Sequence, residues 1–173
     1  MSNVYRTRTY IAADFDHDKD AVEQLHKWND SNHWSLSFVD AHELQTSNDS
    51  SLYCSIKLSL KMRMDHSKTF VLIVGDHTKD ITKGGCQYCD SYNSHNRWCA
   101  RGYSVDYRSY IEYECDEAVE ARIKIIVLYK ATVVDTTKCP DAVKNLGYHT
   151  AMIYRKDEKY YWDYNAVKKA FDS

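Results

Sequence analysis

The sequence contains 173 residues, with 23 lysines and arginines against 25 aspartates and glutamates and a formal net charge of -2. A chain of this length is expected to form one domain, residues 1–173, and to bury roughly two-thirds of the surface of its unfolded chain. The balanced charge provides no overall field to attract nucleic acid or an anionic membrane, so we expect neither as a partner.

No apolar run approaches the roughly 20 residues that span a bilayer, and the N-terminal sequence MSNVYRTRTY lacks the apolar core of a secretory signal. We therefore expect a cytoplasmic protein. In a reducing compartment, its six cysteines are expected to remain thiols or to bind metal rather than to form disulfides.

Short apolar runs and helical patterns alternate along the chain. In chain order, the runs typical of strands covered on both faces are residues 10–13, 37–39, 70–74, 124–129 and 150–154. Helical patterns occur at residues 20–29, 110–122 and 161–171. This alternation predicts an α/β fold with a parallel sheet of about five strands and helices on both faces.

The segment 54–64, CSIKLSLKMRM, fits two kinds of secondary structure. Its apolar residues alternate as in a strand, whereas Ile56, Leu60 and Met64 lie four residues apart, as on one side of a helix. We predict a helix, because the apolar pattern is longer than a usual strand and the next strand follows almost at once.

A long polar insertion, at about residues 78–108, precedes the second helical pattern. Its tyrosines and tryptophan argue against disorder, and ordered loops of this length are often binding segments or lids. Within it, Cys86-x-x-Cys89 is followed by His95 and Cys99, four residues that could coordinate a structural zinc ion. One CxxC pair is a weak indication, so packed or hydrogen-bonded thiols are the alternative.

Polar residues follow three of the predicted strands. Because ligands of open α/β sheets bind beyond the carboxyl ends of the strands, these residues are expected to face one crevice. They are Asp14-Phe15-Asp16, Asp40-Ala41-His42 and Gly75-Asp76-His77. The histidines of the chain are scattered singly, and none of them is assigned a role.

The acidic run DFDHDKD, residues 14–20, allows two interpretations. Asp14 and Asp16 after an apolar strand match the start of a magnesium-dependent phosphotransfer site of the haloacid-dehalogenase type, although the other parts of such a site are not evident. Alternatively, the run is a solvated turn in which Asp18 or Asp20 caps the first helix.

Glu114 raises a question within the helix predicted at 110–122. Ser109 and Glu112 fit a capping box, which explains Glu112. Glu114 flanks the apolar stripe of the helix, where burying a bare carboxylate is costly. It is either a partly exposed carboxylate, paired with Arg108 or Arg122, or a functional group.

The ordered set of these features resembles TIR-like domains, in particular the TIR-like proteins of bacterial Thoeris anti-phage systems. The matching features are a first strand ending in an aromatic residue at 10–15, Phe-Val-Asp-Ala at 38–41, an apolar third strand at 70–75 and the Tyr-Ile-Glu-Tyr-Glu run at 110–114. The resemblance covers about residues 8–130. The chain departs from the family in Tyr110, where tryptophan is common, and in its cysteine-bearing insertion.

The resemblance implies a flavodoxin-like, TIR-type fold and an enzyme that cleaves NAD between nicotinamide and ribose. Thoeris members cyclise the remaining ADP-ribose into a signal for a partner effector protein. The family pattern implies Glu114 as the catalytic carboxylate and Phe15 as a packing surface for nicotinamide or adenine. It further implies that Asp14, Asp40 and Tyr110 line the pocket. The resemblance further implies that NAD is the substrate and that no cofactor is required, and assembly into a homo-oligomer is common in the family.

Two other functions remain open at this point. One is a non-catalytic TIR-like module that self-associates or binds a partner. The other is the magnesium-dependent phosphotransfer enzyme that uses Asp14 and Asp16.

Overall fold

The protein is built on a four-stranded parallel sheet. The computed structural model describes residues 6–34, 36–43 and 52–173. The sheet has the order β1-β2-β5-β6, with β1 at Arg8–Ala12, β2 at Ser67–Val74, β5 at Lys124–Tyr129 and β6 at Tyr148–Ala151. Each neighbouring pair of strands is parallel, which confirms the predicted α/β fold.

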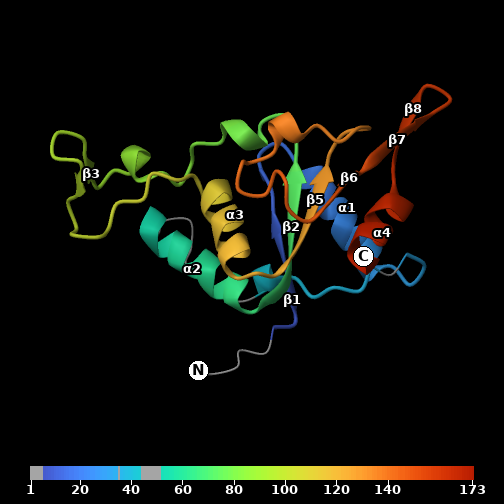
Figure 1. The fold of residues 1–173 in the computed structure, drawn as a ribbon, viewed down its shortest axis with the longest axis horizontal. Helices are drawn as coiled ribbons and strands as arrows, with labels where there is room; N and C mark the ends of the chain where they lie inside the picture. Colours follow the sequence, from blue (N-terminus) through green and yellow to red (C-terminus); the bar gives the residue numbers. More distant parts are fainter. Residues whose placement is uncertain (1–5, 35, 44–51) are drawn as a thin grey trace.

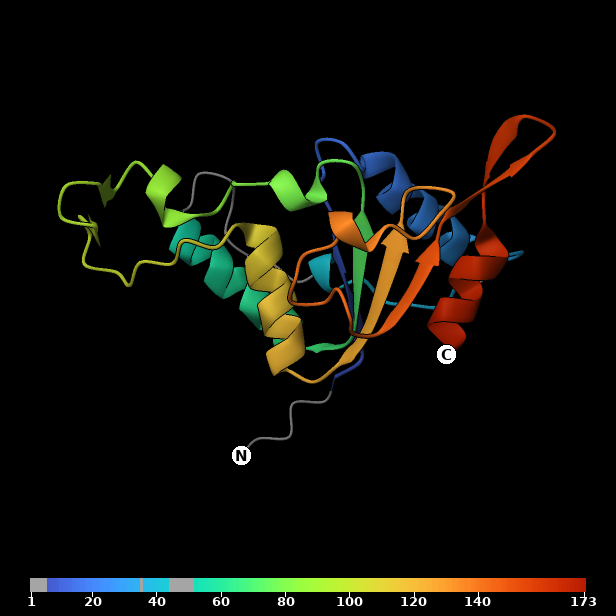
Figure 2. The ribbon, with the colours of Figure 1, turned by 45° about the horizontal axis from the view of Figure 1, so that its top comes forward.

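Helices cover both faces of this sheet, as expected (Figure 1). They are α1 at Lys19–Asp30, α2 at Tyr53–Asp65, α3 at Tyr110–Glu120 and α4 at Tyr164–Asp172. In Figure 2, α2 and α3 lie on one side of the strands and α1 and α4 on the other. The segment 54–64 is therefore helical, as predicted.

Alternate residues of the strands point to opposite faces of the sheet and belong to two different hydrophobic cores. Along β1, Tyr10 and Ala12 belong to the core under α2 and α3, whereas Ile11 belongs to the core under α1 and α4. All three side chains are at most 1 % exposed. The period of two residues in a strand thus places Tyr10 on the face that α3 covers.

The prediction of a strand at 37–39 is wrong, because these residues form no strand. The pairing nearest to them is an isolated bridge between Asp40 and Thr9. Ser37 has a φ of 58°, in the left-handed region, which no continuous strand can contain. The bridge is parallel and lies beside β1. With Asp40 counted at that edge, the element order matches the flavodoxin-like order 2-1-3-4-5.

The strand predicted at 150–154 is divided in two. After Ala151 the chain leaves the sheet and forms an antiparallel hairpin of β7, Ile153–Lys156, and β8, Lys159–Trp162. Asp157 and Glu158 have positive φ values of 49° and 61°, as in a two-residue hairpin turn. The hairpin projects from the sheet (Figure 1).

The C-terminal helix begins later than predicted. Residues 161 and 162 belong to β8 rather than to the helix. The side chain of Asp163 accepts a hydrogen bond from the backbone N–H of Ala166 at 2.9 Å, and this N-cap starts α4 at Tyr164.

The insertion at 78–108 forms an extended arm on the side of the molecule opposite the hairpin (Figure 1). Its elements are the 3-10 turns η2, Thr78–Asp80, and η3, Cys86–Tyr88, and the short antiparallel strands β3, Tyr92–Asn93, and β4, Trp98–Cys99. Two further 3-10 turns are η1, Ala41–Glu43, and η4, Thr136–Lys138. Among the helices of the described residues, none is both long and apolar enough to cross a membrane.

Gly147, just before β6, lies very close to the backbone of β5. A Cβ atom at Gly147 would lie 2.3 Å from the backbone oxygen of Ile125, and its φ is +80°. Gly102 has a similar φ of +77° but nothing within 4 Å of such an atom. We predict that Gly102→Ala costs about 1–2 kcal/mol through backbone conformation alone. Gly147→Ala should cost about 1–3 kcal/mol more through the steric clash.

The two variants are compared by urea unfolding followed by circular dichroism. Because their φ values match, the difference between them isolates the contact with Ile125. Equal losses of unfolding free energy would show that the close approach of Gly147 to β5 does not exist.

Candidate functional site

A cavity of about 590 Å³ opens beyond the carboxyl ends of β1 and β2. This volume falls within the roughly 300–1,000 Å³ of small-molecule sites. Its walls come from the β1–α1 loop, η1, α2, the segment after β2 and the first turns of α3. A smaller cavity of about 260 Å³ lies beside Arg108 and Asp141, and Glu114 does not line it.

Glu114 lies in the wall of the larger cavity and is only 7 % exposed. Its Oε1 accepts a hydrogen bond of 2.5 Å from the hydroxyl of Tyr10, which β1 carries toward α3. The first turn of α3 is fixed by the predicted capping box, in which Ser109 and Glu112 bond reciprocally. Arg108, one of the two expected partners of Glu114, instead donates to Asp106 and Asp116.

Burial makes Glu114 a weaker acid than an exposed glutamate. It raises the pKa of Glu114 to about 7, while the hydrogen bond from Tyr10 and the electrostatic effects of His42 and Arg63 act in the opposite direction. Burial and then the neighbouring Glu114 raise the pKa of Tyr10 well above its usual value. Tyr10 therefore remains the donor while Glu114 changes charge near neutral pH.

The residues expected to bind substrate lie partly around this cavity. Asp14, Phe15 and Tyr110 line it together with Glu114. Phe15 is half exposed at 50 %, so its ring is available to a ligand. Asp40 is not among the lining residues, and this corrects the expectation that it forms part of the wall.

Asp40 lies one layer behind the cavity. Its Oδ1 accepts hydrogen bonds from the backbone N–H of His42 at 2.8 Å and from His42 Nδ1 at 3.0 Å, and its Oδ2 pairs with His26 Nε2 at 3.0 Å. Burial would raise the pKa of Asp40, but the hydrogen bonds from His42 outweigh it and the pKa is lowered. Asp40 therefore acts on the cavity through His42, which lines it.

The acidic run forms a structured turn. Asp14 accepts from the backbone N–H of Asp16 at 3.1 Å and pairs with His17 Nδ1 at 2.7 Å. Asp18 stands at the N-cap of α1 without a side-chain capping bond, whereas Asp20 accepts from the N–H of Ala21 at 2.9 Å. These contacts agree best with the turn interpretation, in which Asp20 rather than Asp18 supports the helix start.

Of the four residues considered for zinc, the three cysteines lie around one cavity, whereas the histidine does not. Cys86, Cys89 and Cys99 line a small apolar cavity that Cys54 of α2 completes, and His95 is not among its lining residues. All six cysteines are free thiols. Across residues 6–34, 36–43 and 52–173, no three His, Cys, Asp or Glu side chains are grouped so that they could hold a metal ion.

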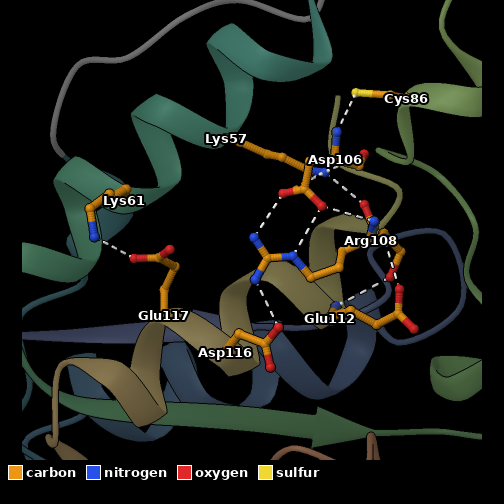
Figure 3. A network of polar contacts seen from close by, with 9 residues as sticks. Lys57, Lys61, Cys86, Asp106, Arg108, Glu112, Asp116 and Glu117 are labelled. Atoms are coloured by element: carbon orange, nitrogen blue, oxygen red, sulfur yellow. Dashed lines mark hydrogen bonds and ion pairs between the residues drawn. The ribbon is translucent and has the colours of Figure 1, made fainter. Parts of the chain in front are cut away.

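A polar network holds the end of the insertion against α2 and α3 (Figure 3). Lys57 of α2, 4 % exposed, donates to the carbonyl oxygens of Arg108 at 2.7 Å and Asp106 at 3.3 Å. The Arg108 guanidinium donates to the Asp106 and Asp116 carboxylates, each at 2.8 Å. Lys61 and Glu117 form a second contact between α2 and α3 at 2.5 Å. The network therefore fixes the start of α3, four residues before Glu114.

One family model matches the chain, that of the Thoeris protein ThsB, TIR-like domain, over residues 10–83. The chain is similar to the TIR-like domain of Thoeris ThsB. This confirms the resemblance that the sequence predicts. No curated protein matches the chain.

The matched residues of the ThsB-like domain run from within β1 to the segment after β2. They include Asp14, Phe15, Asp40 and His42, whereas Glu114 in α3 lies outside them. The structure connects the two parts, because residues of the matched segment and Glu114 line the same cavity.

Three residues of the candidate site are assigned no role from the sequence. Tyr10 contacts Glu114, while His42 and Arg63 line the cavity. Tyr10 could have been singled out from the sequence, since a tyrosine inside a buried apolar strand needs a hydrogen-bond partner for its hydroxyl. His42 follows Asp40 at an expected ligand edge, but Arg63 has no positional signal in its helix.

The raised pKa of Glu114 predicts a pH-dependent stability. Between the ordinary carboxyl pKa of 4.5 and about 7, the folded state keeps a proton that the unfolded state has lost, so the contribution of Glu114 to stability falls as the pH rises. Glu114→Gln removes this fall. We predict that the variant matches the wild type near pH 4.5 and exceeds it by about 3 kcal/mol above pH 7.

Urea unfolding of both proteins at several pH values between 4.5 and 8 measures the difference. The control is Glu120→Gln, which changes an exposed carboxylate at the end of the same helix. Parallel pH profiles for the wild type and Glu114→Gln would contradict the burial of Glu114.

Proposed function

We propose that this protein cleaves NAD, releases nicotinamide and converts the remaining ADP-ribose into a signalling nucleotide, which we expect to be cyclic. One observation carries the proposal: a buried carboxylate, Glu114, lies in the wall of a cavity large enough for a nucleotide portion of NAD. The family similarity supports a role of this reaction in anti-phage defence.

The chemistry suits a single carboxylate. Nicotinamide leaves NAD as a neutral molecule from a cationic pyridinium, so the leaving group needs no acid. Positive charge develops on the ribose, as in glycoside cleavage. An ionised Glu114 beside that ribose stabilises the transition state more than the ground state, and its buried surroundings strengthen the attraction.

Tyr10 gives Glu114 its orientation in this proposal. Its hydroxyl donates to one carboxylate oxygen, Oε1. The other oxygen, Oε2, is then the one to face the ribose. Because Tyr10 is fully buried in the strand, the carboxylate is held in place before the substrate binds.

The other lining residues supply binding surfaces. The half-exposed ring of Phe15 offers a face for nicotinamide or adenine, and Tyr110 borders the cavity near the start of α3. Asp14 adds a carboxylate that can accept hydrogen bonds from ribose hydroxyls. The reaction as proposed requires no cofactor.

The product would act on a downstream effector protein in the cytoplasm. Assembly into a homo-oligomer is part of the proposal, because TIR-like enzymes commonly work as assemblies. The activity is therefore sought at high protein concentration.

The test is the conversion of NAD by purified protein, with nicotinamide measured by chromatography and the second product by mass spectrometry. Wild type should release nicotinamide, and Glu114→Gln should lose about 10²–10³-fold or more of the rate, since it removes a preorganised charge. Glu120→Gln, on the same helix but exposed, should keep the wild-type rate.

Three results would reject the proposal in different ways. Equal turnover by Glu114→Gln would remove the carboxylate from the reaction. Phosphotransfer activity abolished by Asp14→Asn and by a chelator would favour the magnesium-dependent enzyme. Concentration-dependent assembly without NAD turnover would favour the non-catalytic module.

A further inference from the structure

We propose that His42 is the general base of the reaction. Held by Asp40, it accepts the proton of the hydroxyl group that attacks the ribose carbon after nicotinamide has left. This inference rests on the proposed function and adds a second catalytic residue to it.

His42 lies in the wall of the same cavity as Glu114. Its ring centroid is 5.1 Å from that of Tyr10, whose hydroxyl donates to Glu114. The ring of Phe15 also approaches that of His42, edge-on, with 6.2 Å between the ring centroids. His42 is thus fixed between the strand residue that orients Glu114 and the exposed ring expected to contact the substrate.

Asp40 determines which nitrogen of His42 can accept a proton. The carboxylate takes hydrogen bonds from both the backbone N–H and Nδ1 of His42, and its other oxygen pairs with His26. With the carboxylate ionised and 9 % exposed, Nδ1 must be the protonated nitrogen of the neutral ring. The lone pair is then on Nε2, the arrangement of a histidine base oriented by an aspartate.

The proposed reaction needs a proton acceptor other than Glu114. Glu114 must remain an anion while the ribose carries positive charge. In the second step, a bond forms between the hydroxyl oxygen and the ribose carbon, and the O–H bond breaks with its electron pair staying on oxygen. The proton passes to Nε2 of His42. The side chain of His42 is 27 % exposed, so the imidazolium can release this proton to water.

The first experiment needs no substrate. Long-range ¹H–¹⁵N spectra of the wild-type protein at pH 8 report the tautomer of each histidine. We expect His42 to carry its proton on Nδ1, and Asp40→Asn to reduce that population. A wild-type His42 protonated on Nε2 would overturn the proposal, whatever the protein does with NAD.

The second experiment compares variants in the NAD assay. His42→Ala should lower product formation by about 10²–10³-fold, with KM changed less than about threefold, because a base acts on the chemical step. Added imidazole should restore part of the rate to His42→Ala but none to Glu114→Gln. His33→Ala, at an exposed histidine away from the cavity, is the matched control.

The outcomes separate the two proposals. An inactive wild type would overturn the proposed function and the base with it. An active wild type with an equally active His42→Ala would overturn only the role of His42. A slow His42→Ala that imidazole does not rescue, with a lowered melting temperature, would show that His42 acts through packing alone and would also overturn the proposal.

Discussion

The buried hydrogen bond between Tyr10 and Glu114 is the interaction on which the site depends. It joins β1 to α3 across 104 residues of sequence. A carboxylate that is only 7 % exposed is costly to ionise, and the tyrosine hydroxyl offsets part of that cost. The raised pKa of about 7 shows that the offset is incomplete. The protein thus carries a carboxylate with a raised pKa at the wall of the cavity, as functional sites often do.

The rest of the structure keeps this contact in place. The parallel sheet presents Tyr10 to α3, and the network of Lys57, Asp106 and Arg108 anchors the first turn of that helix. The long insertion returns to α2 and α3 at this network. Because its hydrogen bonds join α2, α3 and the end of the insertion, the network primarily fixes the position of α3.

Sequence periodicity identified the helices and most of the sheet, because burial on two faces leaves a continuous apolar signal. It failed at 37–39, where a positive φ at Ser37 breaks a run that is otherwise typical of a strand. It also failed at Met152, where the chain leaves the sheet although the apolar character continues. At Ser37 the backbone conformation of one residue decides the outcome, and composition does not encode it.

The site was predictable only in part. Glu114 could be singled out because a carboxylate beside an apolar stripe needs an explanation. Its partner Tyr10 lies far away in sequence, and only the packing of α3 on β1 brings the two together. Asp40 was expected in the cavity wall, yet it lies behind His42 because its short side chain is satisfied by that residue.

The most direct test of the account is the binding of intact NAD to the Glu114→Gln variant, followed by nuclear magnetic resonance of the ¹⁵N-labelled protein. The account predicts saturable shifts that cluster at Phe15, His42 and Tyr110, around the cavity that position 114 lines. Shifts that cluster elsewhere, for example beside Arg108 and Asp141, or the absence of any saturable change would contradict it.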